Sequence, residues 1–264
     1  MKKIIAVLML IILTFMMCAC KNEDKNKTDE KSKPTTETKE NQVVETTAPI
    51  TEEPTKPEHS EFYIEGIDVD DIITYFNEVC LDAEVVYSGD ASLLQKWTVP
   101  ISYTIEGNYT NEDLRVLDSF VSFLNTIEGF PGISQASNQI NANLDIHFCD
   151  EQTMYDIMGY DMTGLDGRVT FWYDNNAIYD ATICYRNDIE QYTRNSVILE
   201  EIYNGLGPLQ DTSIRADSII YSEFTTPQEL TEIDELILKL LYHPDIKCGM
   251  NKEECEEIIR KLYY

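Results

Sequence analysis

The sequence predicts an α/β (α+β) domain in which a mixed sheet, mostly antiparallel at its edges, carries its main helices on one face. Of the 264 residues, 43% are hydrophobic, which is enough for one sizeable core. Helical spacing of apolar residues alternates with short β-branched and aromatic runs, in the order helix, strand, helix, strand, hairpin and three helices. Residues 61–264 contain no internal repeat, so we expect one domain there.

The first half of this domain yields two helices and a strand. Residues 67–79 space their apolar side chains at helical intervals, which predicts a short amphipathic helix. Residues 97–109 are rich in β-branched and aromatic side chains and predict a strand. Asn111 is a good helix N-cap, and the apolar residues after it recur at helical spacing as far as Leu124.

The second half begins with strands and ends with helices. Residues 144–149 alternate between apolar and polar, which predicts a short strand. Residues 169–173 and 178–185 flank Asp174, Asn175 and Asn176, so we expect a hairpin there. Three helices should follow, at about 193–206, 231–242 and 252–263.

The N-terminal residues predict that the protein is exported, and they are not part of the folded domain. Lys2 and Lys3 precede an uncharged run over residues 4–17, which is the basic and apolar pattern of a signal peptide. The run is shorter than the roughly 20 residues that a membrane-spanning helix needs. We therefore expect residues 1–19 to be a signal peptide.

A polar segment separates this signal from the predicted domain. Residues 21–60 contain no glycine and no aromatic residue and are dominated by Lys, Glu, Thr, Asn and Pro. Such a composition cannot bury enough apolar surface to offset the entropy lost on ordering. Residues 20–60 therefore predict a disordered, acidic, Thr- and Pro-rich tether.

The charge of the chain excludes one class of partner. Its 48 acidic residues against 20 basic ones give a net charge of −28, and residues 61–264 hold 38 of the acidic and 11 of the basic residues. Nucleic acid is excluded because binding a phosphate backbone requires clustered Lys and Arg. Anionic lipid surfaces repel such a domain, so a lipid anchor rather than a basic patch must hold it at a membrane.

The informative stretch of the domain lies at residues 199–211. On a helix, Glu200, Glu201 and Asn204 share one sector, and apolar residues fill a wide opposite face. Gly207 should close this helix and turn the chain, which brings Gln210 and Asp211 back towards the polar strip. This pattern predicts a helix with one face in the core and a polar strip that lines a cleft.

The end of the signal resembles the lipobox of bacterial lipoproteins. Ala19 directly precedes Cys20, after Met17 and Cys18. The resemblance implies cleavage before Cys20 and lipidation of its thiol. It places the protein outside the cytoplasm, anchored to the bacterial cytoplasmic membrane. The alternative is an ordinary secretory signal whose two cysteines are accidental.

The polar helix resembles the active-site helix of the metzincin metallopeptidases, whose pattern is HExxHxxGxxH. Aligning the two on Gly207 places Glu201 at the general-base glutamate. Glu200, Asn204 and Gln210 then occupy the three zinc-ligand positions. The glutamate and the glycine match, whereas all three histidines are missing. The resemblance therefore implies a zincin-like domain without its zinc ligands.

The resemblance extends over roughly residues 97–242. Residues 217–221 resemble the Met-turn sequence, and residues 230–242 resemble the C-terminal helix of matrixin-like catalytic domains. A further set of short motifs lies at Glu200-Glu201, Leu206-Gly207, Asp211, Ser218-Ile219 and residues 230–234 and 241–244. On these motifs the chain is more similar still to an uncharacterised family of bacterial exported and lipoprotein domains, a domain of unknown function. Glu201 is then the candidate catalytic residue, and the expected groove beside it comprises Glu200, Asn204, Gly207, Gln210, Asp211, Ser218 and Tyr221.

These residues do not predict a zinc enzyme. Catalytic zinc needs about three firm protein ligands and an open water position. Asn204 and Gln210 offer only weak neutral oxygens, so we expect no zinc and no other cofactor. Calcium or another hard cation would suit Glu200, Gln210 and Asp211 better.

The leading hypothesis is an extracytoplasmic, membrane-anchored lipoprotein whose pseudo-peptidase domain binds a peptide or a protein without cleaving it. A hydrolase with Glu201 as general base, using a non-zinc metal or no metal, is an alternative. A structural lipoprotein of the cell envelope is another. In the simplest interpretation, Glu201 only anchors its helix, and Glu200 and Asn204 are solvated. Gly207 is then a helix C-cap, and Ser218 and Tyr221 serve turns and packing.

Overall fold

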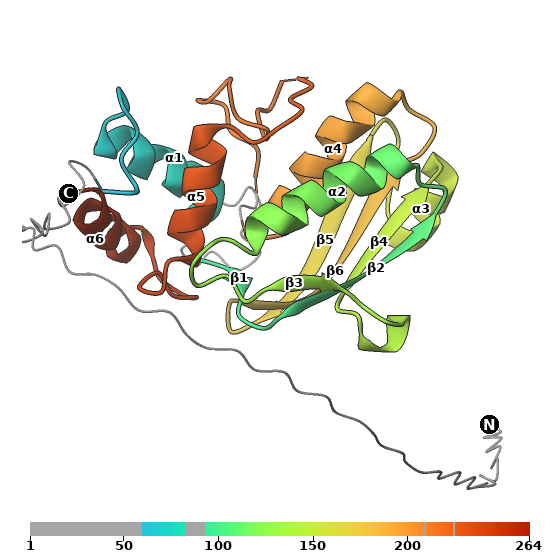
Figure 1. Cartoon of the computed structure of the whole chain (residues 1–264), viewed down its shortest axis with the longest axis horizontal. Coiled ribbons are helices and arrows are strands. Elements are labelled where there is room, and N and C mark those ends of the chain that lie inside the picture. Colours follow the sequence, from blue (N-terminus) through green and yellow to red (C-terminus); the bar gives the residue numbers. More distant parts are fainter. Residues whose placement is uncertain (1–59, 83–92, 208–209, 224) are drawn as a thin grey trace, which may run out of the picture. The chain divides into compact units, whose positions relative to one another are not determined.

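The strands of the described residues form one six-stranded sheet, and two helices lie against one of its faces (Figure 1). The structure is a computed structural model that describes residues 60–82, 93–207, 210–223 and 225–264. All of these belong to one compact unit, Thr55–Tyr264. The predicted signal peptide, Cys20 and the tether as far as residue 59 lie outside the described residues.

The element order agrees with the sequence prediction and adds three short elements to it. Strand β3, the 3-10 helix η1 and helix α3 were not predicted. The bounds are α1 Val69–Leu81, β1 Lys96–Trp97, β2 Ile101–Gly107, α2 Asn111–Leu124, β3 Ile133–Gln135, η1 Gln139–Asn141, β4 Leu144–Cys149, α3 Glu151–Met158, β5 Gly167–Asp174, β6 Ala177–Arg186, α4 Gln191–Asn204, α5 Glu232–Tyr242 and α6 Lys252–Tyr263.

The sheet is mixed, as expected, but it is mostly parallel. Strands β6, β4, β2 and β3 follow one another with parallel pairing, and β1 also pairs with β6 in parallel. Only β5 and β6 pair antiparallel in the described part of the chain. The expectation of mostly antiparallel edges is therefore wrong. The intervening helices and loops carry the chain back between neighbouring strands, which a parallel sheet requires.

Local chemistry explains where the strands break and turn. Pro100 separates β1 from β2, so the single strand predicted over residues 97–109 is divided. Proline has no backbone N–H to donate to a strand ladder. Asn175 and Asn176 connect β5 to β6 with φ angles of 49° and 64°. Positive φ at both residues is what a two-residue type I′ hairpin needs, and asparagine tolerates it.

Most helices begin at a side-chain cap, whereas α4 begins after Glu190 without one. Helix α2 follows Thr110, whose hydroxyl oxygen accepts from the Asp113 backbone amide while the Asp113 carboxylate accepts from the Thr110 amide. Asn111 is therefore the first helical residue and not the cap. The same reciprocal arrangement starts α5 at Thr231 and α6 at Asn251. Each pair satisfies two N–H groups that have no partner within the helix.

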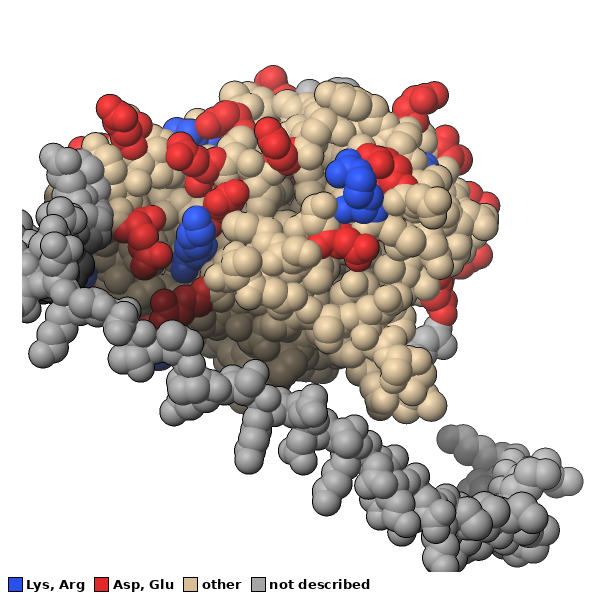
Figure 2. All heavy atoms as spheres, viewed as in Figure 1, with Lys and Arg blue, Asp and Glu red and all other residues tan. Residues whose placement is uncertain are grey.

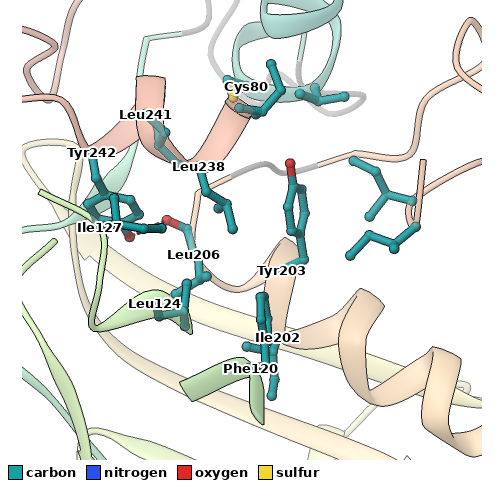
Figure 3. Close-up of a cluster of buried hydrophobic side chains, with 14 of the residues drawn as sticks. Cys80, Phe120, Leu124, Ile127, Ile202, Tyr203, Leu206, Leu238, Leu241 and Tyr242 are labelled. Atoms are coloured by element: carbon teal, nitrogen blue, oxygen red, sulfur yellow. Dashed lines mark hydrogen bonds between the residues drawn. The ribbon is translucent and has the colours of Figure 1, made fainter. Parts of the chain in front are cut away.

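The main core joins α2, α4 and α5. Figure 3 shows Phe120, Tyr203 and Leu241, one from each helix, meeting in this cluster. Tyr203 also donates its hydroxyl hydrogen to the Asp234 carbonyl at 3.1 Å, which ties α4 to α5. The apolar face predicted for α4 is thus buried as expected. No helix in the described ranges is long and apolar enough to cross a membrane.

A buried ion pair fixes α4 against α2. The Arg194 Nε atom donates to the Asp113 carboxylate at 2.8 Å, and both side chains are at least 95% buried. The same guanidinium donates to the carbonyl oxygens of Asn187 and Ile189, just before α4. Because every strong donor of this cation has an acceptor, the pair sets the position of α4 over the sheet.

Candidate functional site

A polar cleft of about 480 Å³ opens beside α4. We call it the α4 cleft. One wall is α4, the second is the start of β5 with the loop before it, and the third is the loop over residues 210–225. Its surface contains both acidic and apolar side chains, so it can contact a ligand in more than one way.

The structure brings most of the predicted groove together. Glu200, Glu201 and Asn204 line the α4 cleft from the helix, as their shared sector predicts. The following loop supplies three further members of the predicted groove, which are Gln210, Asp211 and Tyr221. Gly207 and Ser218 do not line the cleft.

Gly207 turns the chain, as predicted, but it does not close the helix. Helix α4 ends at Asn204, and its C-cap is Gly205. Gly207 has a φ of 141°, and a Cβ atom there would lie 2.6 Å from the Gln95 carbonyl oxygen. It allows the chain to turn where the backbone passes close to a neighbouring segment.

Ser218 is a buried anchor rather than a groove residue. It is 2% exposed, donates its hydroxyl hydrogen to Asp234 at 2.7 Å, and accepts from the Tyr75 hydroxyl at the same distance. Asp234 is the partner of the N-cap residue Thr231 in the capping box of α5. The loop that forms the third wall is thereby tied to both α1 and α5. Sequence spacing could not reveal this role because both partners lie far from Ser218 in the chain.

Glu78 of α1 holds the other end of the same loop. Its carboxylate accepts from the Thr212 hydroxyl at 2.6 Å and from the Ser213 backbone amide at 2.9 Å. Its carbonyl accepts from the Gln210 side-chain amide at 2.7 Å. Within the loop, Thr212 and Tyr221 form a parallel bridge. These contacts keep Gln210 and Tyr221 at the cleft.

Glu201 sits where β5 approaches α4 most closely. Its side chain is 8% exposed. A Cβ atom at Gly167 would lie 2.8 Å from the Glu201 Cγ atom and 2.4 Å from Val197 Cγ1. The strand can therefore reach the helix only because residue 167 has no side chain.

The two glutamates of the cleft are weak acids. Burial raises the pKa of Glu201 to about 8, and the Glu200 carboxylate adds to the rise, whereas Arg168 and a hydrogen bond from the Val169 amide oppose it. Burial raises the pKa of Glu200 to about 7, with further contributions from Asp211 and Asp166. At neutral pH the cleft thus holds at least one carboxylic acid that can donate a hydrogen bond.

Arg168 supplies the positive charge of the cleft. It lines the second wall, and the carboxylates of Glu201 and Asp211 both favour its charged form. Its guanidinium also donates to the Tyr160 hydroxyl at 3.4 Å. The sequence analysis did not single out this residue. The only sequence pattern that pointed to Arg168 was weak: it is a single basic residue near the start of an aromatic strand in an acidic domain.

Two oxygen atoms of the cleft residues are buried without a hydrogen-bond partner, Asn204 Oδ1 and Gln210 Oε1. Such acceptors would suit a ligand that donates hydrogen bonds or a hard cation. Within the described ranges, however, no group of three or more His, Cys, Asp or Glu side chains is arranged to hold a metal ion. Glu200, Gln210 and Asp211 as cation ligands stay a prediction.

The chain resembles one known protein family along most of its length. The family described as "Protein of unknown function (DUF2927)" matches residues 69–261, from the start of α1 almost to the end of α6. This range includes all three walls of the α4 cleft. Comparison with curated proteins gives no match. The chain therefore belongs to this DUF2927 family.

Proposed function

We propose that the protein is an exported lipoprotein, anchored through Cys20, whose zincin-like domain binds an extended peptide segment in the α4 cleft without cleaving it. The order of strand, long helix, strand, hairpin and polar helix supports the zincin-like interpretation. The cleft beside the polar helix supports binding there. The strongest support for the proposal is the outer backbone edge of β5, which lies along the cleft.

The outer edge of β5 faces the cleft. The Arg186 amide donates to the Asp166 carbonyl at 2.8 Å, and the pairing register continues from there along β5. In an antiparallel pair, alternate residues point their N–H and C=O groups away from the partner strand. Those residues are Gly167, Val169 and Phe171, and all three line the α4 cleft.

An exposed strand edge is a template for another extended chain. Main-chain hydrogen bonds to the edge give such a complex its affinity, and pockets for alternate side chains give it specificity. The Val169 amide already meets the Glu201 carboxylate. A bound peptide would lie along this edge on the open side of the α4 cleft, since β5 and α4 are in direct contact at Gly167.

The charges favour a basic segment. The cleft contains Arg168 together with five carboxyl groups, those of Asp166, Glu200, Glu201, Asp211 and Glu223. Acidic side chains (red) are also spread over the face in Figure 2, where basic ones (blue) are few. Complementary charge speeds encounter and selects among partners. We therefore expect Lys- or Arg-containing peptides to bind better than acidic ones.

The test removes one backbone donor from the outer edge. In Phe171→Pro the lost N–H points away from β6, so the β5–β6 ladder keeps its hydrogen bonds. Phe171→Ala is the matched control, because it loses the same side chain and keeps the N–H. The probes are fluorescein-labelled ten-residue peptide mixtures, one rich in Lys and Arg and one rich in Asp and Glu.

We expect fluorescence anisotropy to show binding of the basic mixture to the wild-type protein and to Phe171→Ala, and a loss of at least tenfold in affinity in Phe171→Pro. Circular dichroism of the three proteins should be the same. Equal affinity of the two variants would rule out binding along the strand edge. Binding of neither mixture to the wild-type protein would favour the structural envelope lipoprotein instead.

A hydrolase that uses Glu201 is the second candidate. It is favoured by the raised pKa of a buried carboxyl group in a cleft, which is a common property of catalytic groups. Glu201 would act as a base only when ionised, so turnover of peptide or ester substrates should rise as pH increases through about 8. Glu201→Gln should abolish that turnover. If Glu201→Gln leaves the turnover unchanged, Glu201 is not the general base.

A further inference from the structure

A second cluster of side chains, on the opposite face of the sheet from α4, consists of sulfur-bearing residues. Cys149 of β4 and Cys184 of β6 are buried there with Met154 and Met162, and Met158 packs against them. We call these five residues the sulfur cluster. Residues 61–264 contain nine cysteines and methionines, so more than half of them meet at this one place.

The main core is built differently. Its buried members are Ile, Leu, Val, Phe, Tyr, Trp and Ala with two cysteines, and they include no methionine. Leucine would fill the space under α3 equally well if the cluster only packed a helix onto the sheet. A set made only of thiols and thioethers is therefore unusual for the packing of this domain. It points to a property of sulfur other than volume.

The fold aligns the two thiols. Cys184 lies opposite His147 in the parallel β4–β6 pair, and Cys149 lies two residues further along β4. Because alternate strand residues share a face, both sulfurs lie on the same side of the sheet. They are close enough for the Cys184 thiol to donate a hydrogen bond to Cys149, which lowers the pKa of Cys149.

Helix α3 and the loop after it place the thioethers over this pair. Met154 and Met158 are four residues apart and share one face of α3, and Met162 follows the Gly159 cap. Met154 and Met162 are 0% and 1% exposed. Met158 is half-buried and Cys149 is 7% exposed, so the cluster comes nearest to the surface at these two residues.

We propose that the sulfur cluster is a binding site for a soft monovalent metal ion of the copper(I) class. The two cysteines are the primary ligands, and one or more of the three methionine thioethers complete the coordination. Soft sulfur ligands select this kind of ion over the hard cations that carboxylates prefer. The proposal is independent of peptide binding in the α4 cleft.

The proposed binding step balances without a redox partner. Binding of one copper(I) ion by two thiolates releases two protons to solvent, transfers no electrons and leaves a net charge of −1. Arg186 is the register partner of Cys149 in the β4–β6 pair, so a positively charged residue neighbours the proposed site. A hard divalent cation would find no carboxylate among the members of the cluster.

The experiment titrates copper(I) into the full-length protein under anaerobic, reducing conditions, with the chromophoric chelator bicinchoninate as competitor. Cys149→Ala/Cys184→Ala removes the proposed ligands. Cys80→Ala/Cys255→Ala is the matched control, because these cysteines are also buried and interact electrostatically, but no methionine is buried in their cluster. Cys248, and Cys18 and Cys20 where the preparation retains them, are unchanged in every variant, so any copper that they bind is a constant background.

We expect the Cys149→Ala/Cys184→Ala protein to bind one equivalent less than the wild-type protein, and the control to bind as much as wild type. Replacing Met154, Met158 and Met162 together by leucine should weaken that equivalent at least tenfold, whereas Met250→Leu should not. If the two cysteine double variants bind the same number of copper ions, the site does not exist. If the triple leucine variant binds copper with unchanged affinity, the methionine thioethers are not ligands. A Cys149–Cys184 disulfide in protein isolated without reductant, detected by mass spectrometry, would overturn the proposal in favour of a structural cross-link.

Discussion

Glu201 is stabilised as a neutral acid, which gives the protein a specific dependence of stability on pH. Its folded-state pKa of about 8 lies above the ordinary value of 4.5. Between these values the folded state binds more protons than the unfolded state, so the free energy of unfolding falls as pH rises. Glu200, with a pKa of about 7, acts in the same direction.

Glu201→Gln should therefore flatten this dependence. The amide is neutral at every pH. Between about pH 5 and 9, the free energy of unfolding of the variant should therefore fall by about 1–3 kcal/mol less than that of the wild-type protein. Urea unfolding followed by circular dichroism at several pH values measures this. The exposed Glu229→Gln is the control and should follow the wild-type curve. If the free energies of unfolding of Glu201→Gln and wild type change with pH in the same way, the pKa of Glu201 is not raised.

Gly167 determines how closely β5 can approach α4. Alanine at this position would overlap Val197 and Glu201, so we expect Gly167→Ala to destabilise the protein by about 1–3 kcal/mol. Gly205 is the control because its Cβ atom would have contacts no closer than 3.2 Å, and Gly205→Ala should cost clearly less. Thermal unfolding compares the two. An equal effect would mean that the close approach does not matter.

At the scale of elements, the Arg194–Asp113 pair is the main polar connection between α2 and α4. Arg194→Met leaves Asp113 buried without its partner, which should destabilise the protein by about 3–5 kcal/mol. Arg115 and Glu112 form an exposed pair on α2 at 2.6 Å. Arg115→Met should leave the free energy of unfolding close to that of the wild-type protein, because solvent screens an exposed pair. Urea unfolding of both variants measures the contrast, and equal effects would contradict the assigned role of the buried pair.

Local sequence patterns identify elements whose apolar spacing is strong. Helices α1, α2, α4, α5 and α6, strand β4 and the β5–β6 hairpin were predicted within a few residues. Strand β3 has only three residues, and α3 buries only Met154, so neither has a clear period. The parallel pairing of the strands depends on contacts between distant residues, which local periodicity does not contain.

The same distinction applies to the α4 cleft. Helical geometry alone predicted that Glu200, Glu201 and Asn204 share one surface, because those residues belong to one element. It could not predict that Ser218 is buried, since Tyr75 and Asp234 determine its position from other helices. The outer edge of β5 was missed because its functional groups belong to the backbone, and no residue type marks them.

At the scale of the whole molecule, anchoring through Cys20 stays a prediction. We expect the wild-type protein to incorporate an alkyne fatty acid and to sediment with membranes, and Cys20→Ser to do neither. Cys18→Ser is the control, because the resemblance to a lipobox places the lipid on Cys20 alone. In-gel fluorescence after dye coupling measures the incorporation. Labelled Cys20→Ser protein would contradict lipidation at this residue.

The contacts of Glu78 would give such an anchor a mechanical consequence. Helix α1 is the first helix of the described chain, and Glu78 and Tyr75 connect it to both ends of the loop that forms one wall of the α4 cleft. A pulling force transmitted from a lipidated N-terminus would load α1 before any strand of the sheet. Tension on the anchor would then distort the cleft loop before the sheet unravelled, and occupancy of the cleft would depend on how strongly the protein is pulled.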